Sequence, residues 1–266
     1  MRPALSDPEV MPNLSGISRD SLIGRLLRAP LRLIPPSTVV PILQGVLRGK
    51  KWTVGSATHG CWLGSYEYQK QRALQHELKV GDVVYDIGAN VGFYSLLASV
   101  TVGEAGHVYS FEPLPENLRE LRRHLEMNHI KNCTVIDAAV SSAHGEANFD
   151  PSDDRCIGRL AAAGSLRVRI VCLDDLALRN LIRPPNLMKI DIEGTELECL
   201  RGAADVIQVS RPIIFLATHG PEIHSACAEL LARWNYRLTS LDGRPVESAD
   251  ELIARPTIGQ SAASFK

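Results

Sequence analysis

This sequence of 266 residues lacks an excess of charge of either sign. Its 29 Lys and Arg residues are balanced by 30 Asp and Glu residues, so that the formal net charge at pH 7 is -1. A chain with this balance has no overall positive field of the kind that holds a phosphate backbone or an anionic membrane. We therefore expect that nucleic acid is not its main partner.

Paired cysteines and a long apolar run are also missing. No run reaches the ~18 apolar residues of a membrane span, and Arg2, Asp7 and Glu9 occupy the place where a signal peptide has its apolar core. Six cysteines occur without a C-x-x-C pair or a histidine at zinc-finger spacing, which predicts buried thiols in a reducing compartment. We expect a soluble, cytoplasmic protein without a transmembrane segment. The cysteines are Cys61, Cys133, Cys156, Cys172, Cys199 and Cys227.

The N-terminal part has a mixed composition. Residues 1–20 show no sustained periodicity and predict a loose tail, whereas residues 22–46 mix Leu, Ile, Arg and Pro in short amphipathic pieces. These pieces predict either a helical pair that packs on the domain or on a second subunit, which we favour, or weak contact with a membrane surface. We expect residues 1–79 to form a tail and a helical cover segment, and residues 80–266 to form one Rossmann-like domain.

Strands and helices alternate from residue 80. An apolar run at 83–87 is followed by glycine and then by helical spacing from Val91. A second strand is expected at 107–113, a helix that begins with Pro115 follows, and a third strand is expected at 133–140. Because strand and helix alternate, the sheet should be parallel.

The second half of the domain continues this alternation after an antiparallel excursion. We expect an α/β fold with a Rossmann-like, mostly parallel sheet, helices on both faces and an antiparallel late strand. The expected elements are the excursion at 144–149 and 165–173, strand, turn and helix over 187–203, a buried strand at 213–218, a helix over 222–235 and a late strand at 236–242.

A glycine turn, D-I-G-A-N-V-G over 86–92, follows the first strand at the edge where open α/β sheets bind ligands. Gly88 allows a sharp turn and a close approach to a ligand, and Gly92 leaves the amides of the first helical turn accessible. Asp86 is placed to accept a hydrogen bond from a ligand ammonium group or from the turn amides. A carboxylate at this position suits a zwitterion better than a pyrophosphate.

Two further acids follow the next strands. Glu112 lies 24 residues after Gly88, where nucleotide-binding enzymes place an acid on ribose hydroxyls. Asp137 ends the third strand beside Ala138, and it either accepts from an adenine amino group or only completes a turn. Asn90 replaces the second glycine of G-x-G-x-x-G, which argues against the alternative of an NAD-dependent oxidoreductase. A catalytically inactive nucleoside-binding module is the other alternative.

Three segments occur in order and carry a family resemblance: VYDIGANVGFYS, SFEPLPENL and LMKIDIEGTELECLRGA. They resemble the FkbM family of S-adenosylmethionine-dependent methyltransferases, in the Rossmann-like class I group, over roughly Gly60 to Tyr236. The resemblance implies S-adenosyl-L-methionine as cofactor. It also implies O-methylation of a hydroxyl on a sugar, a glycan or glycolipid, or a polyketide-type acceptor.

The resemblance also implies site residues. The string CWLGSYEYQK resembles the segment that precedes the glycine turn in the family, which implies that Tyr66 and Glu67 help to close over the cofactor. The alternative is a packed aromatic ring and a solvated acid. Many relatives have a glutamate where this chain reads FLATHG, so the family's acid is in doubt at that strand end. The implied cofactor residues are Asp86, Gly88, Asn90 and Gly92 for the methionine part, Glu112 for the ribose and Asp137 for the adenine.

Candidate catalytic residues follow the next two strands. Asp191 and Glu193 in KIDIEG should face the same way if the chain stays extended, which places at least one carboxylate over the cleft. His219 is the preferred base, because an imidazole pKa of about 6.5 lets it accept a hydroxyl proton at neutral pH. A divalent metal on these three residues is an alternative, but we predict none. We expect the head of Lys189 to reach a sheet edge, and we expect residues 149–164 to help build the acceptor pocket.

Overall fold

The computed structural model describes residues 30–150, 159–160 and 166–257. The chain divides into two compact units, residues 1–72 and 73–266. In the first unit a 3-10 turn η2 (Pro30–Leu33) precedes a two-stranded antiparallel sheet of β1 (Val39–Pro41) and β2 (Lys51–Thr53). A second 3-10 turn and two helices follow, namely η3 (Val54–Ser56), α2 (His59–Leu63) and α3 (Tyr68–Glu77), the last of which crosses into the second unit.

The expected helical pair over 22–46 is wrong for the part that is described. Between Pro30 and Val46 the chain forms one short 3-10 turn and one strand, because its prolines lack a backbone donor and interrupt regular helices. Ile42, Leu47 and Trp52 of this unit are buried. Residues 1–29, which include the expected tail, lie outside the described residues.

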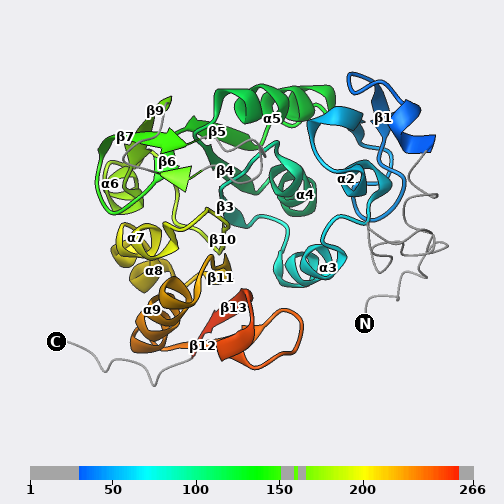
Figure 1. The fold of residues 1–266 in the computed structure, drawn as a ribbon. Helices are drawn as coiled ribbons and strands as arrows, with labels where there is room; N and C mark the ends of the chain where they lie inside the picture. The colour runs from blue at the N-terminus through cyan, green and yellow to red at the C-terminus, as the bar shows by residue number, and fades with distance from the viewer. Residues whose placement is uncertain (1–29, 151–158, 161–165, 258–266) are drawn as a thin grey trace. The chain divides into compact units, whose positions relative to one another are not determined.

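The second unit is built on a seven-stranded sheet with the order β12-β13-β11-β10-β3-β4-β5 (Figure 1). The pairs β5-β4, β4-β3, β3-β10 and β10-β11 are all parallel, as the sequence predicts. The strands are β3 (Val83–Ile87), β4 (His107–Glu112), β5 (Cys133–Asp137), β10 (Leu187–Ile190), β11 (Ile213–Ala217), β12 (Tyr236–Ser240) and β13 (Glu251–Pro256).

Helices cover both faces of this sheet, as expected. Figure 1 shows one group of helices on one face and a second group on the other. The first pair is α4 (Phe93–Val102) and α5 (Pro115–Met127), and the second group is α6 (Leu173–Leu178), α7 (Glu196–Arg201), α8 (Ala204–Ser210) and α9 (Pro221–Arg233). The helix expected to end by residue 203 is α7, whereas α8 was not expected. Between them a Cβ atom at Gly202 would lie 2.1 Å from the carbonyl oxygen of Ser141.

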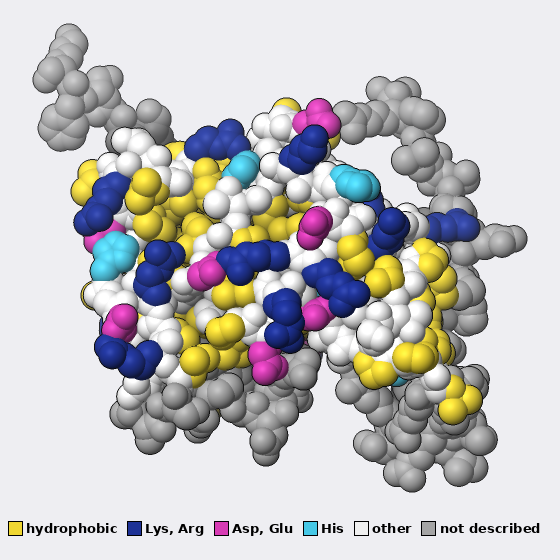
Figure 2. Space-filling view, turned by 90° about the horizontal axis from the view of Figure 1, so that it is seen from above, with side chains coloured by type: hydrophobic (Ala, Val, Ile, Leu, Met, Phe, Trp, Pro, Cys, Tyr) yellow, Lys and Arg dark blue, Asp and Glu magenta, His cyan; other side chains and the backbone are white. Residues whose placement is uncertain are grey.

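The helix α5 shows how the helical pattern is used. Leu121 and Leu125 pack inward with Ala89, next to Ile130 and Val135. Its arginine side chains are exposed, and Figure 2 shows Lys and Arg side chains with Asp and Glu side chains among them over this face. The ion pairs there are Arg119–Glu120, Arg122–Asp137 and Arg123–Glu120.

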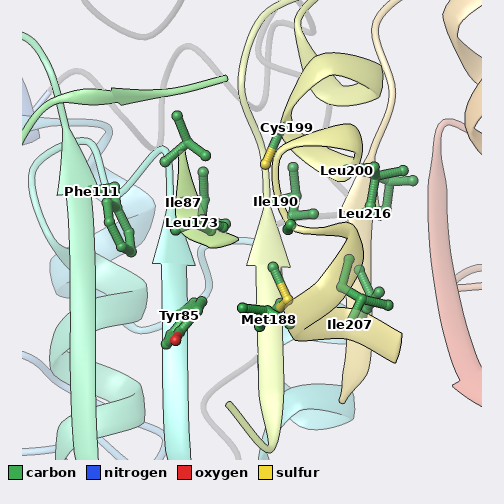
Figure 3. Packing of buried hydrophobic residues seen from close by; sticks show 14 of the residues in the cluster. Tyr85, Ile87, Phe111, Leu173, Met188, Ile190, Cys199, Leu200, Ile207 and Leu216 are labelled. Carbon is green, nitrogen blue, oxygen red and sulfur yellow. The ribbon is translucent and has the colours of Figure 1, made fainter. Parts of the chain in front are cut away.

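The main core lies between the sheet and the helices α6 to α9 (Figure 3). Because neighbouring residues of a strand point to opposite faces, Tyr85 and Ile87 enter this core while Asp86 faces α4. Met188 and Ile190 of β10 continue the same layer. Alternation thus separates a dry face of the sheet from a face that carries polar groups.

The third expected strand differs from the structure. The segment 133–140 is divided, because Ala138 N donates to Ile136 O and this two-residue bond turns the chain. Residues beyond the turn form β6 (Ala139–Val140) in a separate four-stranded sheet, with the order β6-β9-β7-β8. The antiparallel excursion is confirmed, since β7 (Gly145–Asp150) pairs antiparallel with β9 (Leu166–Val171) and with β8 (Arg159–Leu160).

The antiparallel late strand exists, but it is β13, which the sequence analysis did not identify. This strand pairs antiparallel with both β11 and β12, so β12 runs in the same direction as β11. Leu252, Ile253 and Ala254 of β13 are buried in succession, and a strand buried on both faces has no alternating pattern to recognise.

Two of the sequence-based expectations concern thiols and membranes. Cys61, Cys133, Cys172, Cys199 and Cys227 are free thiols, and Cys156 lies outside the described residues. Within the described ranges, no helix has the length and apolar character needed to cross a membrane.

Leu216 tests the core that faces α6 to α9. The Leu216→Ala substitution should lower the free energy of unfolding by about 2–5 kcal/mol, because this side chain is only 1% exposed and its removal leaves a cavity. Val209→Ala on α8 is the control, since Val209 is 81% exposed and its truncation should change stability by less than about 0.5 kcal/mol. Urea denaturation followed by circular dichroism measures both, and equal effects would contradict the assigned core.

Candidate active site at the carboxyl edge of the sheet

The candidate site lies where β3 and β10 end side by side. From β3 the chain continues to β4 on one side, whereas β10 pairs on the other side, so this is the topological switch point where open α/β sheets bind ligands. The residues that follow these strand ends are those that the sequence analysis selected. Asp191 N donates to Ile87 O and brings the segment after β10 against the glycine turn.

Gly88 is required by the protein itself. Its φ of +77° is a left-handed conformation, and a Cβ atom there would lie 2.0 Å from the carbonyl oxygen of Asp191. Asn90 is also left-handed, with a φ of 50°, and its side-chain oxygen accepts from Val91 N. Gly92 has a φ of +89° and caps α4. The close approach of the segment after β10 therefore requires glycine at position 88, whether or not a ligand binds at the turn.

Glu112 is joined to this turn directly. It ends β4, is 4% exposed, and accepts from Asn90 N through Oε2 at 2.8 Å. Its Oε1 accepts from Leu114 N at 3.0 Å and from Asn117 Nδ2 at 3.2 Å. Burial raises the pKa of the Glu112 carboxyl, while these hydrogen bonds and the charge of Lys189 lower it. Each oxygen has two lone pairs, so Oε2 keeps an acceptor position for a further hydroxyl.

Asp86 lies beneath the turn. It is 1% exposed, and its Oδ2 accepts from Ser95 Oγ at 2.6 Å, with Ser110 Oγ donating to Ser95 in turn. Its Oδ1 lies 3.3 Å from Lys189 Nζ. The carboxylate thus contacts an ammonium group of the protein, and not the turn amides. Its expected contact with a ligand ammonium group stays a prediction.

Lys189 lies on β10, an inner strand, and its side chain is buried. Its head reaches the carboxyl edge of the sheet, where the strands end. Nζ donates to Gly88 O at 2.8 Å, lies 3.8 Å from Asp191 Oδ2, and lies 5.5 Å from the centre of the Tyr94 ring. The lysine therefore fixes the glycine turn to β10.

The residues expected near adenine lie one strand further along. Asp137 pairs with Glu112 in the β4-β5 register, is half exposed, and forms an ion pair with Arg122. Ala138 is buried. In the first unit, Glu67 has a φ of 41° and forms an ion pair with Lys70, while Tyr66 O accepts from Gln71. The roles of Tyr66 and Glu67 in closing over a cofactor stay predictions.

The two acids after β10, Asp191 and Glu193, lie near different residues. Asp191 points toward Lys189, whereas Glu193 Oε2 lies 3.4 Å from His219 Nε2. On the other side of the ring, His219 Nδ1 is 2.6 Å from Glu196 Oε1. Within the described residues, no group of three His, Cys, Asp or Glu side chains is arranged to hold a metal ion.

His219 therefore lies between two carboxylates. Its hydrogen bond to Glu196, helped by the charges of Glu193, Glu196 and Asp191, raises its pKa to about 8 against the effect of burial. At pH 7 the ring is therefore mostly protonated. The sequence-based expectation rested on the pKa of an isolated imidazole, about 6.5, at which the ring would be mostly neutral. Burial also raises the pKa of the Glu193 carboxyl, and His219 lowers it.

Glu196 is the site residue that the sequence analysis missed. It begins α7 and is fully buried, and Gly194 N also donates to its Oε1 at 3.1 Å. The signal in the sequence was an acid three residues after Glu193 in a segment that turns into a helix. At the end of β11, the Thr218 hydroxyl donates to Asp250 O and contacts His224 Nδ1 at 2.9 Å.

An open α/β sheet with a glycine turn and an acid at its switch point defines the class of nucleotide-binding Rossmann-like proteins. The family model of the methyltransferase FkbM domain matches residues 86–238, which is more than half of the chain. The chain belongs to this family. The match begins at the aspartate of the glycine turn and ends in β12, so it contains all the strand ends described above.

Two curated relatives resemble parts of the chain. The hexuronic acid methyltransferase AglP of Haloferax volcanii is 30% identical over 141 residues, 52% of this chain and 56% of that protein. The 31-O-demethyl-FK506 methyltransferase FkbM of Streptomyces tacrolimicus is 29% identical over 167 residues, 50% of this chain and 64% of that protein. The chain thus spans less than two thirds of the length of either relative. A crystal structure of methyltransferase FkbM from Methylobacillus flagellatus KT matches with a TM-score of 0.47 and 21% identity, over 65% of this chain and 43% of that chain.

The glycine turn is tested by two substitutions at left-handed positions. Gly88→Ala should lower the free energy of unfolding by about 3 kcal/mol or more, because it adds a steric overlap with Asp191 O to the backbone strain. Gly81→Ala has the same kind of strain, with a φ of +94°, but no atom within 4 Å, and should cost about 1 kcal/mol. Urea denaturation of both variants measures the difference, and similar losses would show that the approach to Asp191 is unimportant.

Proposed function

We propose that this protein is an S-adenosyl-L-methionine-dependent methyltransferase that methylates a hydroxyl group on a sugar, glycan, glycolipid or polyketide-type acceptor. The observation that carries the proposal is the hydrogen bond from Asn90 N to Glu112 Oε2, which joins the glycine turn to the acid of the next strand. The acid is held in place and retains an acceptor position, which fits a ribose with vicinal hydroxyls. Gly88, Asn90 and Gly92 shape the surface for the methionine part.

Asp86 lies beneath the glycine turn and supports the proposed site. Its pairing with Lys189 and Ser95 holds the strand end on which the turn begins. Asp137 and Ala138 are proposed at the adenine side, because their strand end is next to that of Glu112. Tyr66 and Glu67 remain the proposed residues for closure over the cofactor, and the cytoplasmic location also remains part of the proposal.

The bound cofactor would supply a methyl group on a positively charged sulfur. The protein has to align the acceptor oxygen with that methyl group and take the hydroxyl proton. His219 Nε2 would accept the proton of the acceptor hydroxyl as the methyl group is transferred to its oxygen, and the positive charge lost from the sulfur would then be carried by the imidazolium. Glu193, which lies 3.4 Å from Nε2, is placed to orient the hydroxyl, and Asp191 lines the same edge of the sheet.

The acceptor class rests on the family and on the names of the relatives. One relative is named for a hexuronic acid and another for methylation at the 31-O position of FK506. Both names are consistent with an oxygen nucleophile on a densely oxygenated molecule. Residues 149–164, proposed to contribute to the acceptor pocket, fall largely outside the described residues.

The alternatives have weaker support. An NAD-dependent oxidoreductase needs a close approach of pyrophosphate to the turn, and here the Asn90 side chain occupies the position of the second glycine. An inactive nucleoside-binding module would have no use for an imidazole held between two carboxylates, the buried Glu196 and the partly exposed Glu193. We therefore place methyl transfer first.

Cofactor binding is the first test. Calorimetric titration with S-adenosylhomocysteine should show micromolar binding to the wild type and a loss of about 100-fold or more in Glu112→Gln, because the ribose loses charge-assisted hydrogen bonds. Glu126→Gln, an exposed change on α5, should bind like the wild type. NAD is titrated in parallel, and binding of NAD without S-adenosylhomocysteine would favour the oxidoreductase.

The pH dependence of turnover tests the base. Because the proton acceptor must be neutral and the pKa of His219 is raised to about 8, kcat/KM should increase as the pH rises and level off above that value. The neutral fraction, and with it kcat/KM, increases about 25-fold between pH 6.5 and 8.5. His219→Gln should remove this dependence. A profile in the wild type that is flat or falls over this range would show that His219 is not the base.

A further inference from the structure

Glu196 is a buried carboxylate to which the proposed binding of cofactor and acceptor assigns no role. Its side chain is 0% exposed, and one of its oxygens, Oε2, is buried without a hydrogen-bond partner. Its charge acts on the buried thiols Cys199 on α7 and Cys227 on α9, whose pKa values burial and Glu196 raise. A buried carboxylate is usually paired with a cation.

That cation is His219. The distance of 2.6 Å between His219 Nδ1 and Glu196 Oε1 is typical of a strong, charge-assisted hydrogen bond. Gly194 N donates to the same oxygen and fixes the carboxylate. Since Glu196 is an acceptor, Nδ1 must carry a proton, and the nitrogen that gains and loses a proton is Nε2. This nitrogen is on the side of Glu193, where the pair is partly exposed.

We propose that Glu196 is a positioning residue that binds Nδ1 of His219, fixes the ring with Nε2 toward Glu193 and sets the proton affinity of Nε2. The proposal rests on the proposed function, in which Nε2 receives the proton of the acceptor hydroxyl. It adds a residue that neither the sequence analysis nor the cofactor site requires. The pair has the geometry of a carboxylate that orients a catalytic imidazole and stabilises its charged form.

Among the described residues, three carboxylates act on the ring in the same direction. Glu193 and Asp191 follow β10, Glu196 begins α7, and each of them favours the protonated ring, while burial opposes it. The hydrogen bond to Glu196 is the largest of these contributions. Removing the charge of Glu196 should therefore lower the pKa of His219, and the remaining carboxylates limit the size of the change.

The test is a titration of His219 by long-range proton–nitrogen NMR in the full chain, without acceptor. In Glu196→Gln, which keeps size and hydrogen bonding, the midpoint should fall from about 8 toward about 6.5. At pH 7 the neutral fraction of His219 then increases about eightfold. The rising limb of the pH–rate profile moves to lower pH by the same shift as the midpoint. Turnover at pH 7 should therefore be largely retained in Glu196→Gln. A purely structural role of Glu196 predicts instead a loss of turnover at every pH.

Glu198→Gln is the matched control. Glu198 is on the same helix but bonds to Ser142 and Arg201, so its substitution should leave the midpoint unchanged. An unchanged midpoint in folded Glu196→Gln would overturn the proposal. If Glu196→Gln does not fold, the tautomer of the wild type decides: above pH 9 the proton should reside on Nδ1, and a proton on Nε2 would overturn the proposal.

The experiment separates this proposal from the proposed function. The titration needs neither cofactor nor acceptor, so it remains informative if the wild type does not bind S-adenosylhomocysteine, an outcome that contradicts only the methyltransferase assignment. Binding of S-adenosylhomocysteine by the wild type, together with an unchanged midpoint in Glu196→Gln, contradicts only the role of Glu196.

Discussion

A buried ammonium group joins the two central strands of the sheet at the point where the candidate site begins. Lys189 Nζ on β10 donates to Gly88 O and lies 3.3 Å from the carboxylate of Asp86 on β3. A buried charge is stable only when partners surround it, and here a carbonyl, a carboxylate and the Tyr94 ring do so. The glycine turn, Glu112 and the segment after β10 all depend on this arrangement, because each is connected to Gly88 or to its neighbours.

The same edge of the sheet has two electrostatically different halves. Around β3 and β4 the charges are buried: Glu112 accepts from backbone and side-chain donors, and Asp86 accepts from Ser95 and lies 3.3 Å from the ammonium group of Lys189. Around β10 and β11 the carboxylates of Glu193 and Glu196 enclose a single imidazole that is one third exposed. The first half has the rigidity needed to hold a nucleoside, and the second half keeps groups that can exchange a proton. The division follows the strand order and would disappear if β10 and β3 were not neighbours.

Much of this unit could be predicted from the sequence. The boundaries of β3, β4 and α5 follow from apolar runs, glycine and Pro115, and the parallel pairing follows from their alternation with helices. Glu112 was recognisable because its distance from the glycine turn is fixed by one helix and one strand. The strand β13 was not recognisable, since a doubly buried strand has no alternation, and Ala138 gave no sign that it turns the chain between two sheets.

The sequence by itself determined which residues stand at the ends of the parallel strands, because strand periodicity and glycine position are local properties. Only the tertiary structure decided what those residues touch. Gly88 is needed because Asp191 approaches it, Lys189 is buried because β10 lies next to β3, and Asp191 and Glu193 contact different partners. Glu196 meets His219 across 23 residues, and no local pattern encodes the distance of 2.6 Å that raises the pKa of the imidazole. These contacts depend on how the strands and helices pack, and packing is a property of the whole sheet.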